Sequence, residues 1–220
     1  MKQLYTLIVI LLIISFSYAQ THVTADPAAN WSGYMAWFNH TNGVKGDYMN
    51  GSNWGLADLK TTVTASGDTT YSDGAITLQP NFNLYGGGTD SYWADGANGN
   101  KFMEGTSKVE IDAGNFTDGA LSFAGSVASN TIDAGYTVVA FIKTLDPSAG
   151  YATIINQSVT LGATGTNFAV SANDINSSHI VQYGFTVSGM NANPDDEETL
   201  GKVVVSPNTT VLSVKEYNNI

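Results

Sequence analysis

Two adjacent aromatic residues, Tyr92 and Trp93, lie in a stretch that is otherwise small and polar. They follow a Gly-Gly-Gly run and precede several Gly, Asn and Asp residues. A loop of this composition buries few side chains, so we expect both rings to be exposed. An exposed ring can stack on the apolar face of a sugar, and neighbouring amides can hydrogen-bond the sugar hydroxyls. The candidate carbohydrate-binding residues are Tyr92, Trp93, Trp54, Trp31, Tyr85, Asn98 and Gln182.

Two other tryptophans could lie either at the edge of the core or in a sugar-binding site. Trp31 and Trp54 each adjoin Gly, Ser or Asn, which suits either the edge of a core or a sugar platform. Trp37 shares one face of an expected strand with Met35, which favours a place in the core. Two stacked rings would contribute about 4 kcal/mol, so we expect weak single-site binding with a dissociation constant near millimolar.

Aspartates near these aromatic residues could bind a cation. Calcium prefers several oxygen ligands, and the candidates are Asp90, Asp95 and Asp195, with Asp196 or Glu197 in reserve. Asp195 opens a run of four consecutive acids, which also suits a solvated acidic turn. The run lacks the alternating ligands and the glycine of an EF-hand. Calcium is the one cofactor that these residues suggest.

One pair of carboxylates has a spacing that could serve catalysis. Glu110 and Asp112 are two residues apart on an expected strand and therefore share a face. The pattern resembles the acidic strand of laminarinase-like hydrolases, but Ala-Gly-Asn follows where a second Glu is required. His22, His40 and His179 lack the spacing of a zinc motif, and no Gly-x-Ser-x-Gly elbow is present. The sequence therefore favours a protein without catalytic activity.

Basic residues are scarce. The chain has 8 lysines, no arginine and 19 acids, for a formal net charge of -11. Nucleic acids and anionic surfaces are poor partners for such a chain, because their binding needs clustered cations. The missing arginine weighs against uronate lyases and sulfated glycans and favours a neutral glycan, although the lysines could still form a local anion site. The absence of cysteine excludes disulfides and Cys-ligated metals.

The first residues have the form of a cleaved export signal. Met1-Lys2 is a short basic segment, Leu4–Phe16 is almost entirely apolar, and Ser17 and Ala19 are the small residues before a cut at Gln20. The apolar segment is shorter than the roughly 20 residues of a membrane-spanning helix, so we expect a secreted or cell-surface protein without membrane insertion. The predicted division is a signal peptide (1–19), a polar lead-in (20–30), one β-sandwich domain (31–207) and a tail (208–220).

These candidate residues must be positioned by β-strands. Short apolar or alternating runs are separated by Gly, Asn, Asp and Ser, and no helical period is evident. Alternation, as in Lys108–Asp112, indicates half-buried antiparallel strands, so we predict an all-β fold, a two-sheet antiparallel β-sandwich of the jelly-roll type. The expected strands are Gly33–Phe38, Leu56–Ala65, Ala75–Leu78, Phe102–Ile111, Leu121–Val127, Thr137–Leu145, Thr153–Leu161, Asn167–Ser171, Val181–Ser188 and Lys202–Val205. Long loops are expected at Asn39–Asn53, Tyr85–Lys101 and Gly189–Gly201.

Several of these segments are similar to strands of jelly-roll carbohydrate-binding modules. They are Asn100–Glu104, Tyr136–Lys143, Val181–Phe185 and Leu200–Val205. The chain resembles exported domains of polysaccharide-degrading Bacteroidetes, which are often appended to glycoside hydrolases or lyases. The resemblance implies a polysaccharide ligand, a fused or co-secreted carbohydrate-active enzyme, and a structural calcium ion between loops. Val211–Ile220 resembles the junction before a type IX secretion sorting domain.

The leading hypothesis is therefore a secreted, non-catalytic β-sandwich that binds a polysaccharide, preferably a neutral one, through loop aromatics. The alternative is a structural or adhesive cell-surface sandwich whose aromatic residues belong to the core. A glycoside hydrolase or polysaccharide lyase is the less favoured third hypothesis, because the required carboxylate pair or basic residues are missing.

Overall fold

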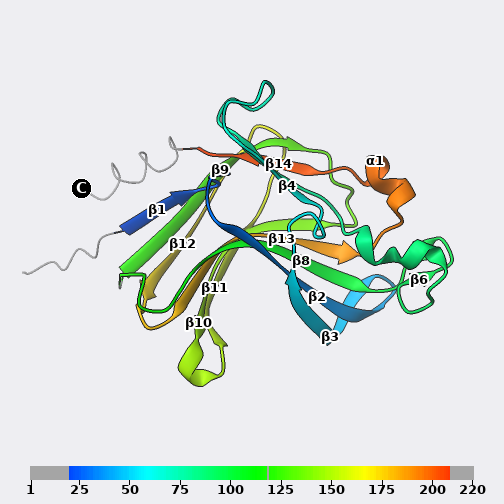
Figure 1. Ribbon diagram of the computed structural model, residues 1–220, viewed down its shortest axis with the longest axis horizontal. Coiled ribbons are helices and arrows are strands. Elements are labelled where there is room, and N and C mark those ends of the chain that lie inside the picture. The colour runs from blue at the N-terminus through cyan, green and yellow to red at the C-terminus, as the bar shows by residue number, and fades with distance from the viewer. Residues whose placement is uncertain (1–19, 118, 209–220) are drawn as a thin grey trace, which may run out of the picture.

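The computed structural model describes residues 20–117 and 119–208, which form two β-sheets packed face to face (Figure 1). The predicted signal peptide, residues 1–19, lies outside the described residues, and so does the predicted tail from residue 209 onward. Within the described ranges, no helix is both long and apolar enough to cross a membrane. The all-β two-sheet fold predicted from the sequence is confirmed.

The first sheet, sheet A, is built around the long strand β9. Its strand order is β1-β9-β14-β5-β4, and β12 pairs with the other edge of β9. β1 runs parallel to β9, whereas the other pairs are antiparallel. The bounds are β1 Gln20–Thr24, β4 Thr61–Thr64, β5 Ala75–Leu78, β9 Gly119–Asn130, β12 Asn167–Ile175 and β14 Val203–Ser206.

The second sheet, sheet B, is antiparallel throughout, with the order β11-β10-β13-β8-β2-β3. The β10–β11 hairpin and β3 therefore form its two margins (Figure 1). The bounds are β2 Trp31–Thr41, β3 Val44–Trp54, β8 Phe102–Ile111, β10 Thr137–Asp146, β11 Ala152–Thr160 and β13 Ile180–Met190.

The core lies between the sheets because inward and outward side chains alternate along each strand. Phe123 of β9 contacts Phe168 of β12 in its own sheet and Phe185 of β13 in the other, with ring centroids 5.6 and 5.2 Å apart. All three rings are buried. A smaller cluster of buried residues forms around Met35 and Met103. The outward side chains of sheet B are thereby free to form a surface of their own.

Two segments that the sequence predicts to be irregular are strands. The lead-in expected at 20–30 contains β1, which extends sheet A. The loop expected at Asn39–Asn53 is the β2–β3 hairpin, whose turn residues Asn42 and Gly43 have φ of 53° and 77°, the conformation that Asn-Gly favours. β3 is not recognisable as a strand from the sequence, because it is an exposed, polar edge strand. Of the strand expected at Leu56–Ala65, only β4 pairs, since a turn occupies its first part.

Two long connections fold into short elements. The loop expected at Tyr85–Lys101 contains a small hairpin, β6 and β7, and overlaps the 3-10 helix η1. The loop expected at Gly189–Gly201 contains η3 and the one-turn helix α1. β6 and α1 lie at the same end of the sandwich, on the right in Figure 1. The bounds are η1 Asn83–Gly88, β6 Ala94–Asp95, β7 Asn98–Gly99, η3 Pro194–Asp196 and α1 Glu197–Leu200.

Gly184 on β13 allows the two central strands of sheet B to approach. A Cβ atom at this position would lie 2.1 Å from the carbonyl oxygen of Ser107 on β8. We expect Gly184→Ala to lower the free energy of unfolding by about 2 kcal/mol, because the strands must separate. Gly105→Ala on β8 is the matched control, since its nearest atom would be 3.4 Å away. Urea denaturation of both variants measures the difference, and equal losses would contradict the close approach.

Candidate functional site

A groove of about 770 Å³ crosses the outer face of sheet B. Its lining comes from β10, β13, β8, β2 and β3, together with the β10–β11 turn and the segment after β3. These five strands are consecutive neighbours, so the groove spans about 19 Å at a strand spacing of ~4.8 Å. A groove of this length can hold several units of a linear polymer.

Three polar side chains form one row across the groove floor. Lys143 of β10, Gln182 of β13 and Glu110 of β8 are direct cross-strand neighbours and therefore share a face. The side-chain N–H of Gln182 donates to Glu110 Oε2 at 2.5 Å, and Lys108 Nζ donates to the same oxygen. The carboxylate of Glu110 is therefore held from two sides.

Glu110 is ionised in this setting. Burial alone would raise the pKa of Glu110, but hydrogen bonds from Lys108 and Gln182 and the charges of Lys108 and Lys143 outweigh burial and lower the pKa. An acid catalyst of glycoside cleavage needs a raised pKa and a second carboxylate. Among the described residues that line the groove, Glu110 is the one acid, and Asp112 lies outside the lining. The groove floor therefore offers one ionised carboxylate that can accept hydrogen bonds.

Gln182 leaves one polar atom without a partner. Its side chain is buried, with 5% exposure, and within the described part of the chain Oε1 has no hydrogen-bond partner. The contact with Glu110 fixes the orientation of the amide, since a flipped Gln182 would place oxygen against oxygen. Buried polar atoms are nearly always paired. An orphan acceptor that lines a groove therefore indicates a place for a donor from outside the chain.

Tyr34 of β2 forms an aromatic part of the lining near β3. Its ring reaches over Gly51 of β3, where a Cβ atom would lie 2.3 Å from the tyrosine hydroxyl. A hydrogen bond with Tyr48 and then burial raise the pKa of Tyr34, so its hydroxyl stays neutral at ordinary pH. Glycine at position 51 thus makes room for a ring across the edge strand.

Tyr151 contributes a second ring at the opposite margin, in the turn between β10 and β11, and is 62% exposed. Its φ of 63° is a left-handed conformation that bulky residues rarely adopt. The turn is fixed, because the N–H of Tyr151 donates to the carbonyl of Asp146 at 2.8 Å and the Asp146 carboxylate accepts from the N–H of Ser148. Strained residues of this kind concentrate at functional sites.

Three of the predicted sugar-binding residues line this groove: Trp31, Trp54 and Gln182. Trp31 also belongs to the core, since it stacks on Phe185 with ring centroids 5.9 Å apart. The indole N–H of Trp31 donates to a backbone carbonyl at 2.8 Å, and that of Trp54 donates to a serine hydroxyl at 3.0 Å. Both tryptophans shape the wall of the groove while their N–H groups are already used.

The other predicted sugar-binding residues lie in the loop Tyr85–Lys101 and do not line the groove. Asn98 is exposed there. Tyr85 is buried, with 5% exposure, and its hydroxyl donates to the carbonyl of Gly96 at 2.9 Å. The expectation that Tyr85 offers an open platform is therefore wrong, because its ring packs beneath its own loop.

Tyr92 and Trp93 form a packed cluster with Trp37. The ring of Trp93 is half-buried and meets Trp37 and Tyr92 edge-on, with centroids 5.6 and 4.7 Å apart. Tyr92 is 42% exposed, but its hydroxyl accepts from Trp37 Nε1 and Lys101 Nζ lies 4.3 Å from its ring centroid. The expected exposure holds for Tyr92 alone, because adjacent large rings bury one another.

Asn191, after β13, holds this loop in place. It is buried, with 1% exposure. Its amide donates to the carbonyls of Leu84 and Trp93 at 2.6 and 2.7 Å, and its side-chain oxygen accepts from the N–H of Lys101 at 2.9 Å. One side chain thus satisfies three backbone groups of the loop.

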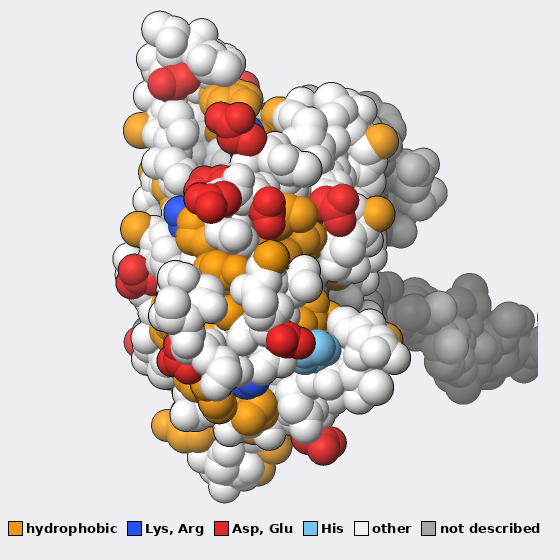
Figure 2. Space-filling model, turned by 90° about the vertical axis from the view of Figure 1, so that its right-hand side faces the viewer, with side chains coloured by type: hydrophobic (Ala, Val, Ile, Leu, Met, Phe, Trp, Pro, Cys, Tyr) orange, Lys and Arg blue, Asp and Glu red, His pale blue; other side chains and the backbone are white. Residues whose placement is uncertain are grey.

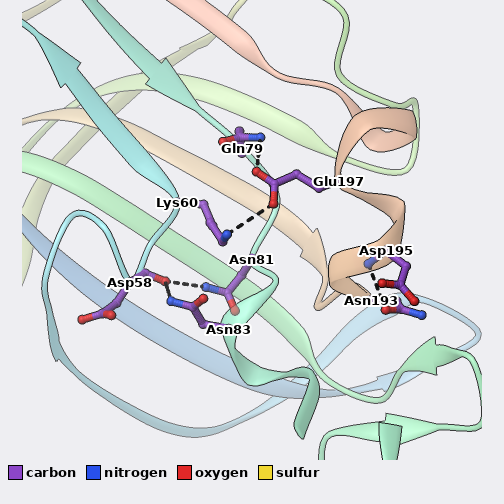
Figure 3. A network of polar contacts seen from close by, with 8 residues as sticks. All are labelled: Asp58, Lys60, Gln79, Asn81, Asn83, Asn193, Asp195 and Glu197. Atoms are coloured by element: carbon purple, nitrogen blue, oxygen red, sulfur yellow. Dashed lines mark hydrogen bonds and ion pairs between the residues drawn. The ribbon is translucent and has the colours of Figure 1, made fainter. Parts of the chain in front are cut away.

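The acidic candidates do not gather around one point. In the part of the chain that the structure describes, no three His, Asp or Glu side chains are placed to hold a metal ion. Asp90 accepts from a backbone N–H, whereas the carboxylate of Glu197 binds Lys60 and a glutamine, apart from Asp195 (Figure 3). Asp90, Asp95 and Asp195 therefore do not share one site, and calcium binding stays a prediction.

The end of the molecule that carries β6 and α1 is acidic. Figure 2 shows Asp and Glu side chains surrounding hydrophobic ones on this face, with few lysines visible. This distribution agrees with the formal net charge of -11. The groove differs, because two lysines lie in its lining.

The groove residues that sequence reasoning missed include Tyr34, Lys108, Lys143 and Tyr151. The alternation around Lys108 correctly predicts an outward face, but it does not say that this face is hollow. Only the register of β10, β13 and β8 brings Lys143 next to Gln182 and Glu110. For Tyr151, the preceding Pro-Ser-Ala-Gly turn is a signal that could have placed an aromatic residue at a hairpin tip.

Comparison with known proteins gives similarity in structure alone. No protein-family model matches the sequence, and no curated protein matches it. One similar solved structure is described as "CBM4 structure and function", with 14% identity, a TM-score of 0.27, and coverage of 69% of this chain and 80% of the other. A second concerns "the promiscuous specificity of the carbohydrate-binding modules from the beta-sandwich super family", with 9% identity, a TM-score of 0.31, and coverage of 80% and 83%. Similarity at this level does not identify a ligand for the present chain.

Proposed function

We propose that the protein is a secreted, non-catalytic module that binds a polysaccharide along the groove of sheet B. The observation that carries the proposal is the buried, unpartnered Oε1 of Gln182 on the floor of a groove long enough for a polymer. A sugar hydroxyl would donate to this oxygen once the Gln182 side chain shifts toward the groove. The ionised Glu110 beside it offers a second acceptor at its other oxygen.

The aromatic residues of the groove supply the apolar part of sugar recognition. Tyr34 lies toward β3, and Tyr151 lies at the opposite margin. A sugar ring that covers one face of a tyrosine would hide roughly 80 Å² of it, for about 2 kcal/mol gross. Rings at both margins with polar groups between them suit a chain of sugars laid across the strands.

We propose that binding serves attachment rather than cleavage. Among the described residues, the groove lining contains one carboxylate, that of Glu110, and its pKa is lowered. Weak attachment becomes effective when it raises the local concentration of a linked activity. A fused or co-secreted carbohydrate-active enzyme is accordingly the proposed partner, and the basic and apolar N-terminal segment supports export.

Replacing Tyr151 is the direct test of the groove. We expect Tyr151→Asn to weaken polysaccharide binding about tenfold, or ~1.4 kcal/mol, through loss of one stacking ring. Asparagine tolerates the left-handed backbone of this position, so the turn is retained. Affinity electrophoresis against laminarin, xylan, mannan, alginate and cellulose identifies a ligand, and calorimetry on that ligand measures the loss.

Tyr92→Ala is the matched control, because this exposed tyrosine lies outside the groove. Its binding is expected to equal that of the unchanged protein. If Tyr92→Ala lost binding and Tyr151→Asn bound as well as the unchanged protein, the binding site would lie in the loop and not in the groove. An absence of retardation on all five polymers would favour the structural or adhesive alternative.

A further inference from the structure

The charge of the groove is opposite in sign to that of the protein. Among the described residues of the lining, the charged side chains are Lys108, Lys143 and Glu110, which sum to one positive charge. The whole chain carries a formal net charge of -11 with 8 lysines. Two of those few lysines therefore lie in one groove, on β10 and β8, with β13 between them.

The two lysines have different surroundings. Lys108 Nζ donates to the Glu110 carboxylate, so its charge is matched within the groove. Within the described part of the chain, Lys143 forms no ion pair within 4.0 Å. Glu104, on the same face of β8, is engaged by Lys45 at 2.6 Å. Lys143 thus keeps an ammonium group that no carboxylate holds.

The position of Lys143 is partly withdrawn from water. Burial and the nearby charge of Lys108 lower the pKa of Lys143, while Glu110 and Glu104 act in the opposite direction. An incoming carboxylate would therefore meet a cation that is less hydrated than a surface lysine. A charge-assisted hydrogen bond formed there is stronger than one at an exposed side chain.

Lys143 also stands beside the orphan acceptor. It pairs in register with Gln182, whose buried Oε1 has no partner among the described residues. The groove floor therefore holds a cation and a buried, unpartnered hydrogen-bond acceptor on adjacent strands. The complementary ligand carries a negative oxygen next to a hydroxyl group, which is the arrangement on the ring of a uronic acid.

We propose that the groove selects polysaccharides that contain uronic acid residues, with the sugar carboxylate bound by Lys143 and a sugar hydroxyl donated to Gln182. The inference rests on the proposed function of the groove. The absence of arginine favours a neutral glycan, and the present proposal differs from that expectation. The reason is that the fold brings two lysines into one groove, which the composition does not reveal. Glu110 remains hydrogen-bonded to Lys108 and Gln182, and these contacts reduce its repulsion of the ligand carboxylate.

Matched polymers test the charge preference directly. Polygalacturonate, alginate and glucuronoxylan are each compared with their carboxyl-reduced forms, which differ only in the uronate group. We expect at least one acidic polymer to bind about tenfold more tightly than its reduced form, and we expect the preference to shrink as salt screens the ion pair. Dextran sulfate serves as the control for a general attraction to polyanions.

Three variants show whether Lys143 causes the preference for acidic polymers. Lys143→Gln is expected to bind the acidic and reduced polymers equally, whereas Lys143→Arg keeps the charge and the preference. Lys202→Gln makes the same change in net charge at an exposed site outside the groove, and its preference is expected to be unchanged. Thermal unfolding confirms that each variant is folded, and Lys143→Arg keeps the test decisive should Lys143→Gln fail to fold.

Different results would overturn uronate selection and the groove function. Binding to the reduced polymers that equals or exceeds binding to the acidic ones, and that falls in Tyr151→Asn, would overturn uronate selection and leave the groove function standing. Equal loss of preference in Lys143→Gln and Lys202→Gln, or equal binding to dextran sulfate, would also overturn it. The absence of binding to every polymer would overturn the groove function itself.

Discussion

Replacing Phe185 by alanine is expected to lower the free energy of unfolding by about 4 kcal/mol. The side chain is fully buried, and its ring meets Phe123 and Phe168 of sheet A at centroid distances of 5.2 and 5.7 Å. Trp31 stacks on it at 5.9 Å. Alanine would leave a cavity between rings that are held by two different sheets, so the surroundings cannot close around it. Urea denaturation followed by tryptophan fluorescence measures the loss.

Two further variants show whether packing is the cause. Phe185→Leu keeps most of the apolar volume and is expected to cost about 1.5 kcal/mol. Ile154→Ala removes an exposed side chain from the edge strand β11 and is expected to cost less than ~0.5 kcal/mol. Should Phe185→Ala and Ile154→Ala prove equally stable, the inter-sheet core as described would be refuted.

Asn191→Ala is expected to lower the free energy of unfolding by about 3 kcal/mol. The substitution leaves the carbonyls of Leu84 and Trp93 and the N–H of Lys101 without their partner in a buried setting. Each unsatisfied buried group costs about 1–3 kcal/mol, and water entering the loop offsets part of the total. Thermal denaturation measures the stability, and limited proteolysis reports whether the loop around Trp93 opens.

Asn191→Asp separates the roles of the two ends of this side chain. The variant keeps the oxygen that accepts from the N–H of Lys101 but places a second oxygen against two carbonyl oxygens. It is therefore expected to be at least as destabilised as Asn191→Ala. Asn98→Ala, at an exposed position of the same loop, is expected to change stability by less than ~0.5 kcal/mol. A stable Asn191→Asp protein would contradict the assigned hydrogen bonds.

Two strands could be predicted to the residue. β5 and β8 have the expected bounds: β8 because apolar and polar side chains alternate in its second half, and β5 because it is a short, buried, largely apolar run flanked by turn residues. β3 could not be recognised by alternation, since both of its faces are largely exposed and a register against β2 holds it in place. The Asn42-Gly43 turn was the available signal for that hairpin.

The site could be predicted only in part. Gln182, Trp31 and Trp54 were identified as candidates from their side-chain chemistry, and they line the groove. The packing of the loop aromatics could not be predicted, because local composition does not show that Trp93 meets Trp37 across the fold. The groove itself depends on the pairing of strands distant in sequence, which a single sequence does not reveal.

The pairing of β1 with β9 has a consequence for the order of folding. Gln20 aligns with Ala120, so this contact closes a long stretch of chain and gains nothing from local hairpin formation. Loop-closure entropy makes such contacts slow to form. β1 also has no fully buried side chain and joins β9 beside an established antiparallel pair. We therefore expect β1 to dock after the two sheets have condensed, and to be the last strand of sheet A to become protected from hydrogen exchange.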